Sequence, residues 1–181
     1  MDFVVPVIQV DRGRYNAIPV AFGAVLAKHI GAKLWLDVFQ INKVDHTDAG
    51  AQGRLQSQPV FDGATPTKGN CLICDDVVTY GATLANLRGF LISTGAEVVA
   101  ATAIGAAYGS TKLAPEIRFI EHLQKRYGQE LEKCTKTLGF ESECLTAREA
   151  HFLAGMRTAE RIRDCVAQRA GSRNRARSIG V

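Results

Sequence analysis

The sequence predicts an α/β fold, in which an open, mainly parallel sheet is flanked by helices and followed by a helical C-terminal extension. Two observations predict it. Between residues 3 and 104, short runs rich in valine, isoleucine and alanine alternate with stretches of helical periodicity. That alternation favours parallel strands joined by right-handed crossovers. With 181 residues, 46% of them hydrophobic, the chain is long enough for one such core and a smaller appendage.

The first half of the core begins with residues 3–10, whose valines and isoleucine predict a buried strand. After a polar turn, Asn16 is a suitable N-cap for a helix that Gly31 would end. Residues 33–39 predict a second strand. The next stretch, about 43–58, is polar and aperiodic, and connections of this length inside a compact domain are typically functional lids or disordered segments.

The second half of the core begins with a short strand near Val60 and a longer one that starts at Cys71. Residues 82–94 predict a helix, which Gly95 would end. Residues 97–104 predict a further strand, so the strand, helix and strand order repeats.

Beyond the core the pattern is helical. Residues 115–137 predict one helix, and Thr146 with Glu149 three residues later forms a capping box that would open a second. The second helix carries an apolar stripe, which would bury either against the core or against a twin subunit in a homodimer. The stripe consists of Leu153, Met156, Ala159, Ile162 and Val166.

Charge and composition divide the chain into a core over residues 1–110, a helical extension over 111–170 and a basic, disordered tail over 171–181. The net charge of +4 is unevenly distributed, because residues 157–181 hold seven arginines against two acidic residues. A basic tail of this kind favours a sequence-independent electrostatic contact with nucleic acid.

The five cysteines and the lack of a long apolar run indicate a cytoplasmic protein with reduced thiols. Cys71 and Cys74 have CxxC spacing, yet they fall within a predicted strand, where residues three apart point to opposite faces, which disfavours a zinc or redox pair. No window reaches the roughly 18 uninterrupted apolar residues of a membrane span, and the first ten residues include no basic residue. We therefore expect neither export nor membrane insertion.

The most informative feature for function is a pair of adjacent acidic residues, Asp75 and Asp76, at the end of an apolar run. In an open α/β sheet, ligands bind beyond the carboxyl ends of the strands, which is where these side chains would project. The following turn contains Gly81, and its backbone N–H groups together with the next helix N-terminus suit a phosphate. One acidic residue would suffice as a helix N-cap, whereas two buried carboxylates carry a large desolvation cost unless a ligand compensates it.

This run of Asp-Asp, two apolar residues and Thr-x-Gly-x-Thr resembles the phosphoribosyl-pyrophosphate (PRPP) motif of the type I phosphoribosyltransferases. The resemblance implies that Asp75 and Asp76 bond the ribose 2′- and 3′-hydroxyls and meet Mg²⁺ only indirectly, through PRPP. It also implies that the loop wraps the 5′-phosphate and that the helical extension forms a hood over the acceptor. The loop residues are Val77, Val78, Thr79, Tyr80, Gly81, Ala82 and Thr83.

Two further segments would complete a PRPP site. Arg12, Gly13 and Arg14 follow the first predicted strand and would open at the same crevice, where guanidinium groups can clamp pyrophosphate bidentately. Lys43 and Arg54 lie in the polar stretch where type I enzymes keep a loop that closes over PRPP. By this resemblance they would neutralise the leaving pyrophosphate.

Two details bear on the acceptor. Residues 12–16 resemble the Arg-Gly-Phe-Asn segment of the competence-protein F branch, although Ala17 stands where that branch has glutamine and no cysteine-rich zinc element precedes the first strand. Thr79 stands where the enzymes that salvage 6-oxopurines place an aspartate. The resemblance therefore disfavours hypoxanthine and guanine as acceptors.

The sequence thus favours a PRPP-dependent phosphoribosyltransferase, which uses Mg²⁺, passes the 5-phosphoribosyl group to a nitrogenous acceptor and releases pyrophosphate. The alternative is a catalytically silent regulator that senses PRPP and contacts nucleic acid. Two other phosphate-binding classes are excluded. The turn at Thr79 lacks the GxxxxGK[ST] spacing of P-loop kinases, and no GxGxxG follows the first strand, as it would in a Rossmann dehydrogenase.

Overall fold

The computed structural model describes residues 1–11, 13–42, 58–108, 110, 112–138, 145–156, 158 and 160–164. These residues belong to two compact units. The described residues up to Ser110 form one, which we call the sheet unit, and those from Lys112 onward form the other, which we call the helical unit.

The sheet unit contains a four-stranded sheet in which every pairing is parallel, as the sequence predicted. In spatial order its strands are β4 (Lys33–Leu34), β1 (Phe3–Pro6), β7 (Asn70–Val78) and β8 (Glu97–Ala106). Phe3 lies opposite Lys33 on one side and Cys71 on the other, which sets the register of the central strands. The sheet therefore has β1 and β7 at its centre.

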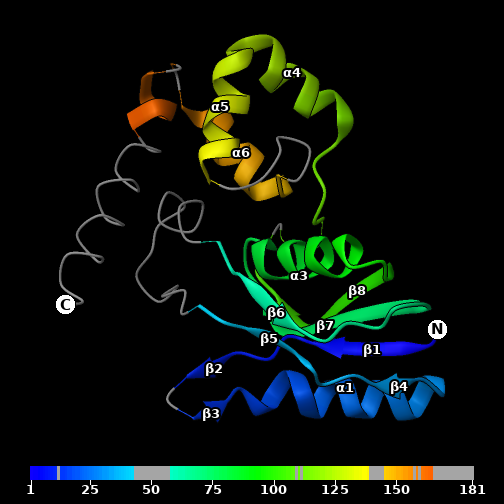
Figure 1. The fold of residues 1–181 in the computed structure, drawn as a ribbon. Coiled ribbons are helices and arrows are strands. Elements are labelled where there is room, and N and C mark those ends of the chain that lie inside the picture. Colours follow the sequence, from blue (N-terminus) through cyan, green and yellow to red (C-terminus); the bar gives the residue numbers. More distant parts are fainter. Residues whose placement is uncertain are drawn as a thin grey trace. The chain divides into compact units, whose positions relative to one another are not determined.

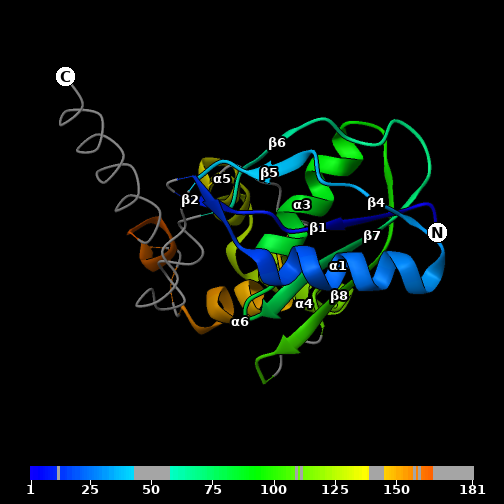
Figure 2. The same cartoon turned by 90° about the horizontal axis from the view of Figure 1, so that it is seen from below.

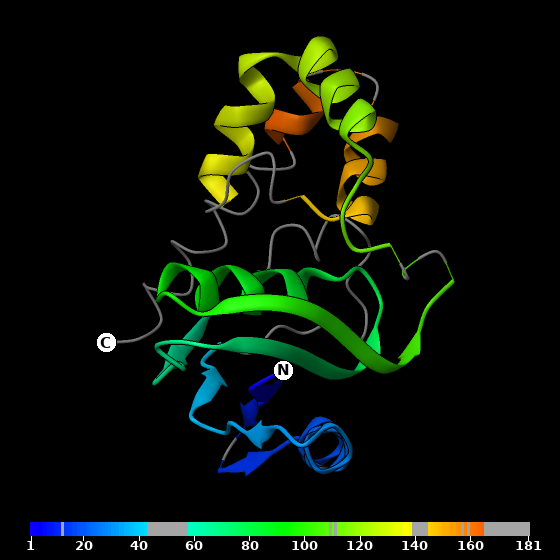
Figure 3. The same cartoon turned by 90° about the vertical axis from the view of Figure 1, so that its right-hand side faces the viewer.

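One helix lies on each face of this sheet (Figures 1 and 3). Helix α1 (Ala17–Ile30) crosses beneath β1 and β7, as Figure 2 shows from below, and buries Ala27 against Val4 and Leu72. Helix α3 (Ala82–Ser93) covers the other face with its buried leucines, which are Leu84, Leu87 and Leu91. The predicted parallel sheet flanked by helices is confirmed.

The ends of α1 follow the sequence signals. The Asn16 side chain accepts a hydrogen bond from the Ile18 backbone N–H at 3.3 Å, so Asn16 is the N-cap. Gly31 ends the helix with φ at 68°, a left-handed conformation that glycine adopts without a Cβ penalty.

Two predicted strands are interrupted in the structure. The first ends at Pro6, and the chain then forms an antiparallel hairpin of β2 (Val10–Asp11) and β3 (Arg14–Tyr15). The second divides into β4 and β5 (Val38–Gln40), because β5 leaves the main sheet and pairs antiparallel with β6 (Phe61–Gly63). Pairing between distant segments thus overrides a continuous local strand pattern.

Two exposed glycines of the sheet unit predict opposite effects of the same substitution. A Cβ would meet no atom within 4 Å at either Gly89 or Gly95. Gly89 lies inside α3, so Gly89→Ala should raise the free energy of unfolding by about 1 kcal/mol through helix propensity. Gly95 has φ at 96°, which a residue with a Cβ adopts only at a cost, so Gly95→Ala should lower the free energy of unfolding by about 1 kcal/mol. Urea unfolding measures both changes, and a shift of the same sign for both would contradict the prediction.

The helical unit contains α4 (Ile117–Tyr127), α5 (Gln129–Leu138) and α6 (Ala147–Gly155). The single helix predicted over residues 115–137 is wrong, because Gly128, with φ at 53°, separates α4 from α5. The predicted capping box is confirmed: Thr146 accepts from the Glu149 backbone N–H, and the Glu149 carboxylate accepts from the Thr146 N–H. The helix that it opens is shorter than predicted and ends at Gly155, after which residues 160–164 are helical again.

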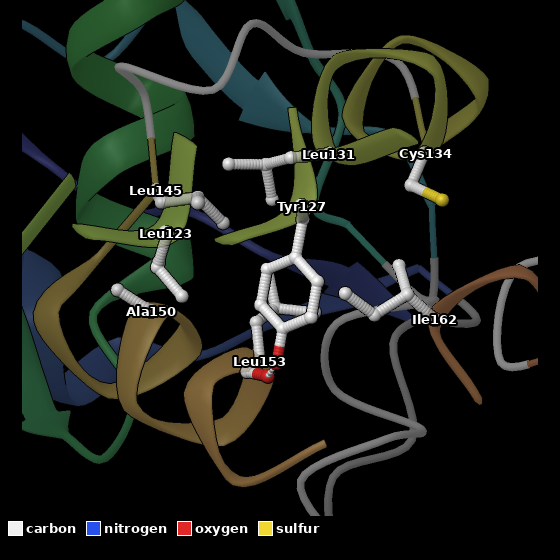
Figure 4. Packing of buried hydrophobic residues seen from close by; sticks show 8 residues of the cluster. All are labelled: Leu123, Tyr127, Leu131, Cys134, Leu145, Ala150, Leu153 and Ile162. Atoms are coloured by element: carbon white, nitrogen blue, oxygen red, sulfur yellow. Dashed lines mark hydrogen bonds between the residues drawn. The ribbon is translucent and has the colours of Figure 1, made fainter. Parts of the chain in front are cut away.

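The core of the helical unit is a cluster of eight buried side chains (Figure 4). At its centre the Tyr127 hydroxyl donates hydrogen bonds to the carbonyls of Leu153 and Met156. Leu153 and Ile162 are both buried within this cluster, so the burial of these two stripe residues does not require a second subunit. Ala159 and Val166 lie outside the described residues.

Cysteine and hydropathy add two observations. Among the described residues, Cys71, Cys74 and Cys134 are buried and free of disulfides. Burial, with a smaller contribution from the charge of Asp75, raises the pKa of Cys74 to about 12, so this thiol stays protonated. None of the described helices is both long and apolar enough to cross a membrane.

Candidate functional site

The strand order of the sheet places a topological switch point between β1 and β7. The chain leaves β1 through α1 toward β4, and it leaves β7 through α3 toward β8, so the two crossovers diverge from adjacent strands. Ligands of open α/β sheets bind at the carboxyl ends of strands where the order diverges in this way. Asp75 and Asp76 lie at this end of β7.

Both aspartates belong to β7, which continues past them to Val78. Pairing with β1 ends where Pro6 lies opposite Cys74, and one more hydrogen bond joins the Val7 N–H to the Cys74 carbonyl at 2.8 Å. Pairing with β8 continues to Val78, which lies opposite Ala106. On one side, the two acidic residues lie in the part of β7 that pairs with β8. On the other side, they extend beyond the end of β1.

Asp75 is a buried carboxyl with 7% of its surface exposed. Burial raises its pKa to about 7, and the neighbouring charge of Asp76 adds to the rise. A hydrogen bond from the Asp76 backbone N–H to Asp75 Oδ1, at 2.9 Å, works in the opposite direction. Near neutral pH, Asp75 thus titrates, so it can accept hydrogen bonds when ionised and donate one when protonated.

Asp76 is half-buried, and each of its carboxylate oxygens accepts a hydrogen bond. Oδ1 accepts from the Val77 backbone N–H at 2.7 Å. Oδ2 accepts from Asn16 Nδ2 at 2.9 Å. From the sequence, Asn16 is expected to cap a helix and to end the segment that resembles the competence-protein F branch. No sequence signal indicates its bond to a residue 60 positions away.

The loop after Asp76 leads directly into α3. Val77 is exposed, Val78 is buried, and Thr79, Tyr80 and Thr83 are half-buried. Gly81 is the N-cap of α3 with φ at 82°, and it has no side chain that could accept from the first N–H groups of the helix. The buried hydroxyl of Ser110 donates to the Thr79 carbonyl, and the Ala107 N–H donates to the Val78 carbonyl at 2.8 Å, so the segment after β8 fixes the start of this loop.

Of the predicted arginine clamp, the structure describes Gly13 and Arg14. Gly13, with φ at 76°, forms the turn of the β2–β3 hairpin, and the exposed Arg14 lies opposite Asp11 in that hairpin. The hairpin leads into Asn16 and so begins α1 beside Asp76. Arg12 lies outside the described residues, and so do Lys43 and Arg54 of the predicted closing loop.

A cluster of amide side chains joins the two ends of that predicted loop. Asn42 donates through Nδ2 to the Gln58 carbonyl at 2.8 Å and accepts through Oδ1 from the Val60 N–H at 2.7 Å. Gln58 Oε1 accepts from Asn86 of α3 at 2.7 Å, and the Asn42 carbonyl accepts from the buried Gln40 side chain at 2.9 Å. This cluster was not predicted from the sequence. The available signal was the amide residues at both ends of the polar stretch, which are Gln40, Asn42 and Gln58.

Removing the Asn42 side chain should weaken the sheet unit. Asn42→Ala leaves the Gln58 carbonyl and the Val60 N–H without this partner, so the free energy of unfolding should fall by about 2 kcal/mol. Asn42→Asp keeps the acceptor and loses the donor, so its free energy of unfolding should lie between those of wild type and Asn42→Ala. Urea unfolding of the three proteins tests this order, and equal midpoints for Asn42→Ala and wild type would refute it.

The donor set at the carboxyl end of β7 suits a polyhydroxylated, phosphorylated ligand. Carboxylate oxygens accept from vicinal hydroxyls, and a helix N-terminus without a side-chain cap offers N–H groups to a phosphate. The two carboxylates also suit Mg²⁺, which prefers oxygen ligands. Across the described residues, no group of three or more His, Cys, Asp or Glu side chains could hold a metal, so Mg²⁺ would reach this site bound to oxygens of the ligand and meet the two carboxylates indirectly.

Comparison with known proteins relates the chain to longer ones. No family model matches it. It is 32% identical over 165 residues to Protein TraN of Escherichia coli, a match that covers 91% of this chain and 37% of TraN. It is 37% identical over 89 residues to an uncharacterized protein of Haemophilus influenzae, covering 49% of this chain and 20% of that protein. The chain thus spans well under half the length of both curated relatives.

Solved structures similar to the chain include phosphoribosyltransferases. An adenine phosphoribosyltransferase matches 60% of this chain and 58% of its own with 21% identity and a TM-score of 0.41. An orotate phosphoribosyltransferase from Aeropyrum pernix matches 61% and 51% of the two chains with 20% identity and a TM-score of 0.38. At these values the similarity does not bear on activity, and the fold described above rests on the chain's own sheet order and register. The resemblance to the competence-protein F branch stays a prediction.

Proposed function

We propose that this protein binds PRPP with Mg²⁺ and transfers its 5-phosphoribosyl group to a nitrogenous acceptor, releasing pyrophosphate. One observation supports this most strongly. The adjacent carboxylates of Asp75 and Asp76 lie at the carboxyl end of β7, at the switch point of the sheet, and are followed within a few residues by the glycine-capped N-terminus of α3.

In this proposal the two aspartates bind the ribose. Asp75 and Asp76 accept hydrogen bonds from the 2′- and 3′-hydroxyls, for which acceptor-only carboxylates are suited. The loop from Val77 to Thr83 binds the 5′-phosphate through backbone N–H groups and the positive end of the α3 dipole. Gly81 has φ at 82° and no Cβ, so the backbone can approach the phosphate closely.

The pyrophosphate would be met by basic side chains from other segments. Arg14 lies in the hairpin after β1, two residues before Asn16, which contacts Asp76. With Arg12 and Gly13 it would clamp the diphosphate. We assign neutralisation of the leaving group to Lys43 and Arg54. Both lie in the polar stretch between Asn42 and Gln58, whose hydrogen bond joins the two ends of that stretch.

The reaction is a displacement at ribose C1. The C1–O bond to pyrophosphate breaks with both electrons going to the leaving oxygen, and the acceptor nitrogen forms the new bond to C1 and loses a proton. Mg²⁺ bound to PRPP supplies charge neutralisation of the departing pyrophosphate. The protein's contribution is to hold the ribose and both phosphate groups in place, which lowers the entropic part of the barrier. Because the chemistry consumes PRPP and the buried Cys71 and Cys74 form no disulfide, we also propose a cytoplasmic location.

A second candidate function is a PRPP-sensing regulator without catalysis, which the excess of arginine in residues 157–181 favours because it suits contact with phosphate backbones. A chain truncated after Gly171 removes three of the seven arginines. If nucleic-acid binding measured at low salt is the same with and without these residues, this alternative loses its basis.

Pyrophosphate release distinguishes the two candidates. The full chain is incubated with PRPP, Mg²⁺ and a panel of purine, pyrimidine and amine acceptors, and pyrophosphate is measured by a coupled assay. We expect release that depends on one class of acceptor and that is lost in an Asp75→Asn/Asp76→Asn variant. PRPP binding without release for any acceptor would support the regulator instead.

A further inference from the structure

Asn16 forms two hydrogen bonds that belong to different parts of the sheet unit. Its Oδ1 accepts from the Ile18 N–H at 3.3 Å and caps α1. Its Nδ2 donates to Asp76 Oδ2 at 2.9 Å. Its own backbone N–H donates to the Gln9 carbonyl at 3.2 Å, which fixes the residue between the end of the hairpin and the start of the helix.

Capping alone does not explain why an asparagine stands at this position. Serine and aspartate cap helices about as well as asparagine. Among the residues that favour helix N-caps, only asparagine presents an acceptor to one partner and a donor to another from a single planar group, since an ionised carboxylate donates nothing and a serine has one short hydroxyl. The pair of contacts at Asn16 uses both ends of the amide.

The contact from Asn16 adds a second restraint to the Asp76 carboxylate. With Oδ1 bonded to the Val77 N–H and Oδ2 bonded to Asn16, the carboxylate plane is set from both ends before any ligand arrives. The remaining lone pairs of both oxygens then have defined directions. Preorganisation of this kind lowers the entropic cost of binding a hydroxyl pair.

From this geometry we propose that Asn16 is a positioning residue, which holds the Asp76 carboxylate in the orientation that receives the ribose hydroxyls; the inference rests on the proposed function. Asn16 acts through Asp76 and does not touch the reacting atoms.

The test separates capping from positioning. Asn16→Ser keeps a cap and removes the donor to Asp76, Asn16→Asp keeps a cap and adds a like charge beside Asp76, and Asn16→Ala removes both contacts. For each variant and wild type, the urea unfolding midpoint and the Kd for PRPP with Mg²⁺ are measured, the latter by calorimetry. Because Asn16→Ser keeps the cap, we expect its midpoint to lie above that of Asn16→Ala. We expect about tenfold weaker PRPP binding by Asn16→Ser and still weaker binding by Asn16→Asp.

A double-mutant cycle shows whether Asn16 acts through Asp76. Combined with Asp76→Asn, the Asn16→Ser change should cause no further loss of PRPP affinity. An equal loss in both backgrounds would overturn the positioning role. If Asn16→Ser proves unstable, Asn16→Asp tests the same point, since an aspartate cap with unchanged PRPP affinity would also overturn it.

The outcomes distinguish this inference from the proposed function. Wild type that binds PRPP while Asn16→Ser binds equally well would overturn the positioning role and leave the proposed function standing. Wild type that fails to bind PRPP would overturn the proposed function and the positioning role with it.

Discussion

Replacing Asp75 and Asp76 together by asparagine should weaken binding of PRPP with Mg²⁺ by at least about 100-fold. Each carboxylate is expected to accept a hydrogen bond from a ribose hydroxyl, and hydrogen bonds to charged groups contribute about 1.5–3 kcal/mol each. Asparagine keeps the size of both side chains, and the buried Asp75, whose pKa is raised to about 7, loses no obligatory charge, so the fold should tolerate the change. Calorimetric titration of both proteins with PRPP and Mg²⁺ measures the effect.

A matched control loses the same two charges elsewhere. Glu97 is exposed at the opposite end of β8, and Glu121 is exposed on α4, so Glu97→Gln/Glu121→Gln should bind PRPP as wild type does. A similar loss of affinity in the control would indicate a long-range charge effect. Unchanged affinity in the Asp75→Asn/Asp76→Asn variant would remove the two aspartates from the ligand site.

Stability should depend on pH through Asp75. Its pKa is about 7 in the folded protein and about 3.8 as an ordinary carboxyl, so between these values the folded state holds a proton that the unfolded chain has released. Folding stability contributed by this group therefore falls as pH rises from about 4 to about 7 and levels off above that. The total change is about 4 kcal/mol, since each unit of pKa difference corresponds to about 1.4 kcal/mol.

The Asp75→Asn variant isolates this contribution. Because asparagine does not titrate, the unfolding free energy of the variant minus that of wild type should increase by about 4 kcal/mol between pH 3 and pH 8 and stay constant above that. Urea unfolding at half-unit pH steps gives this difference, from which any constant effect of the substitution cancels. Parallel curves for the two proteins would show that Asp75 is not buried in the way described.

The elements with strong local signals could be predicted from sequence. Asn16 and Gly31 bound α1 as expected, Thr146 and Glu149 form the expected capping box, and the apolar run at Cys71 is the central strand β7. These features depend on hydrogen bonds and side-chain periods within a few residues. The parallel sheet followed from their order along the chain.

The errors in the fold arose where distant segments decide the structure or where a pattern continued past a glycine. No glycine or proline separates β4 from β5, and their separation depends on β6, more than twenty residues further along. The apolar stripe after Thr146 continued in register across Gly155, although the helix ends there. Similarly, Gly128 divides α4 from α5 within one amphipathic pattern.

The same distinction between local signals and contacts of distant segments applies to the candidate site. The acidic pair and the glycine turn are contiguous in sequence, so their proximity could be predicted. The bond between Asn16 and Asp76 joins residues 60 positions apart and depends on how α1 packs against β7, which no local signal carries. Burial also splits the two acids chemically, since Asp75 is 7% exposed and has a raised pKa. Arg12, Lys43 and Arg54 stay predictions.

Mapping PRPP on the backbone amides would test the proposed site most directly. The ¹⁵N-labelled chain is titrated with PRPP and Mg²⁺ and followed by amide chemical shifts. The proposal predicts that the largest shifts fall on residues 75–83, with smaller ones at Gly13, Arg14 and Asn16, and that inorganic phosphate alone reproduces only those of the loop before α3. Shifts confined to the helical unit, or none at saturating PRPP, would contradict it.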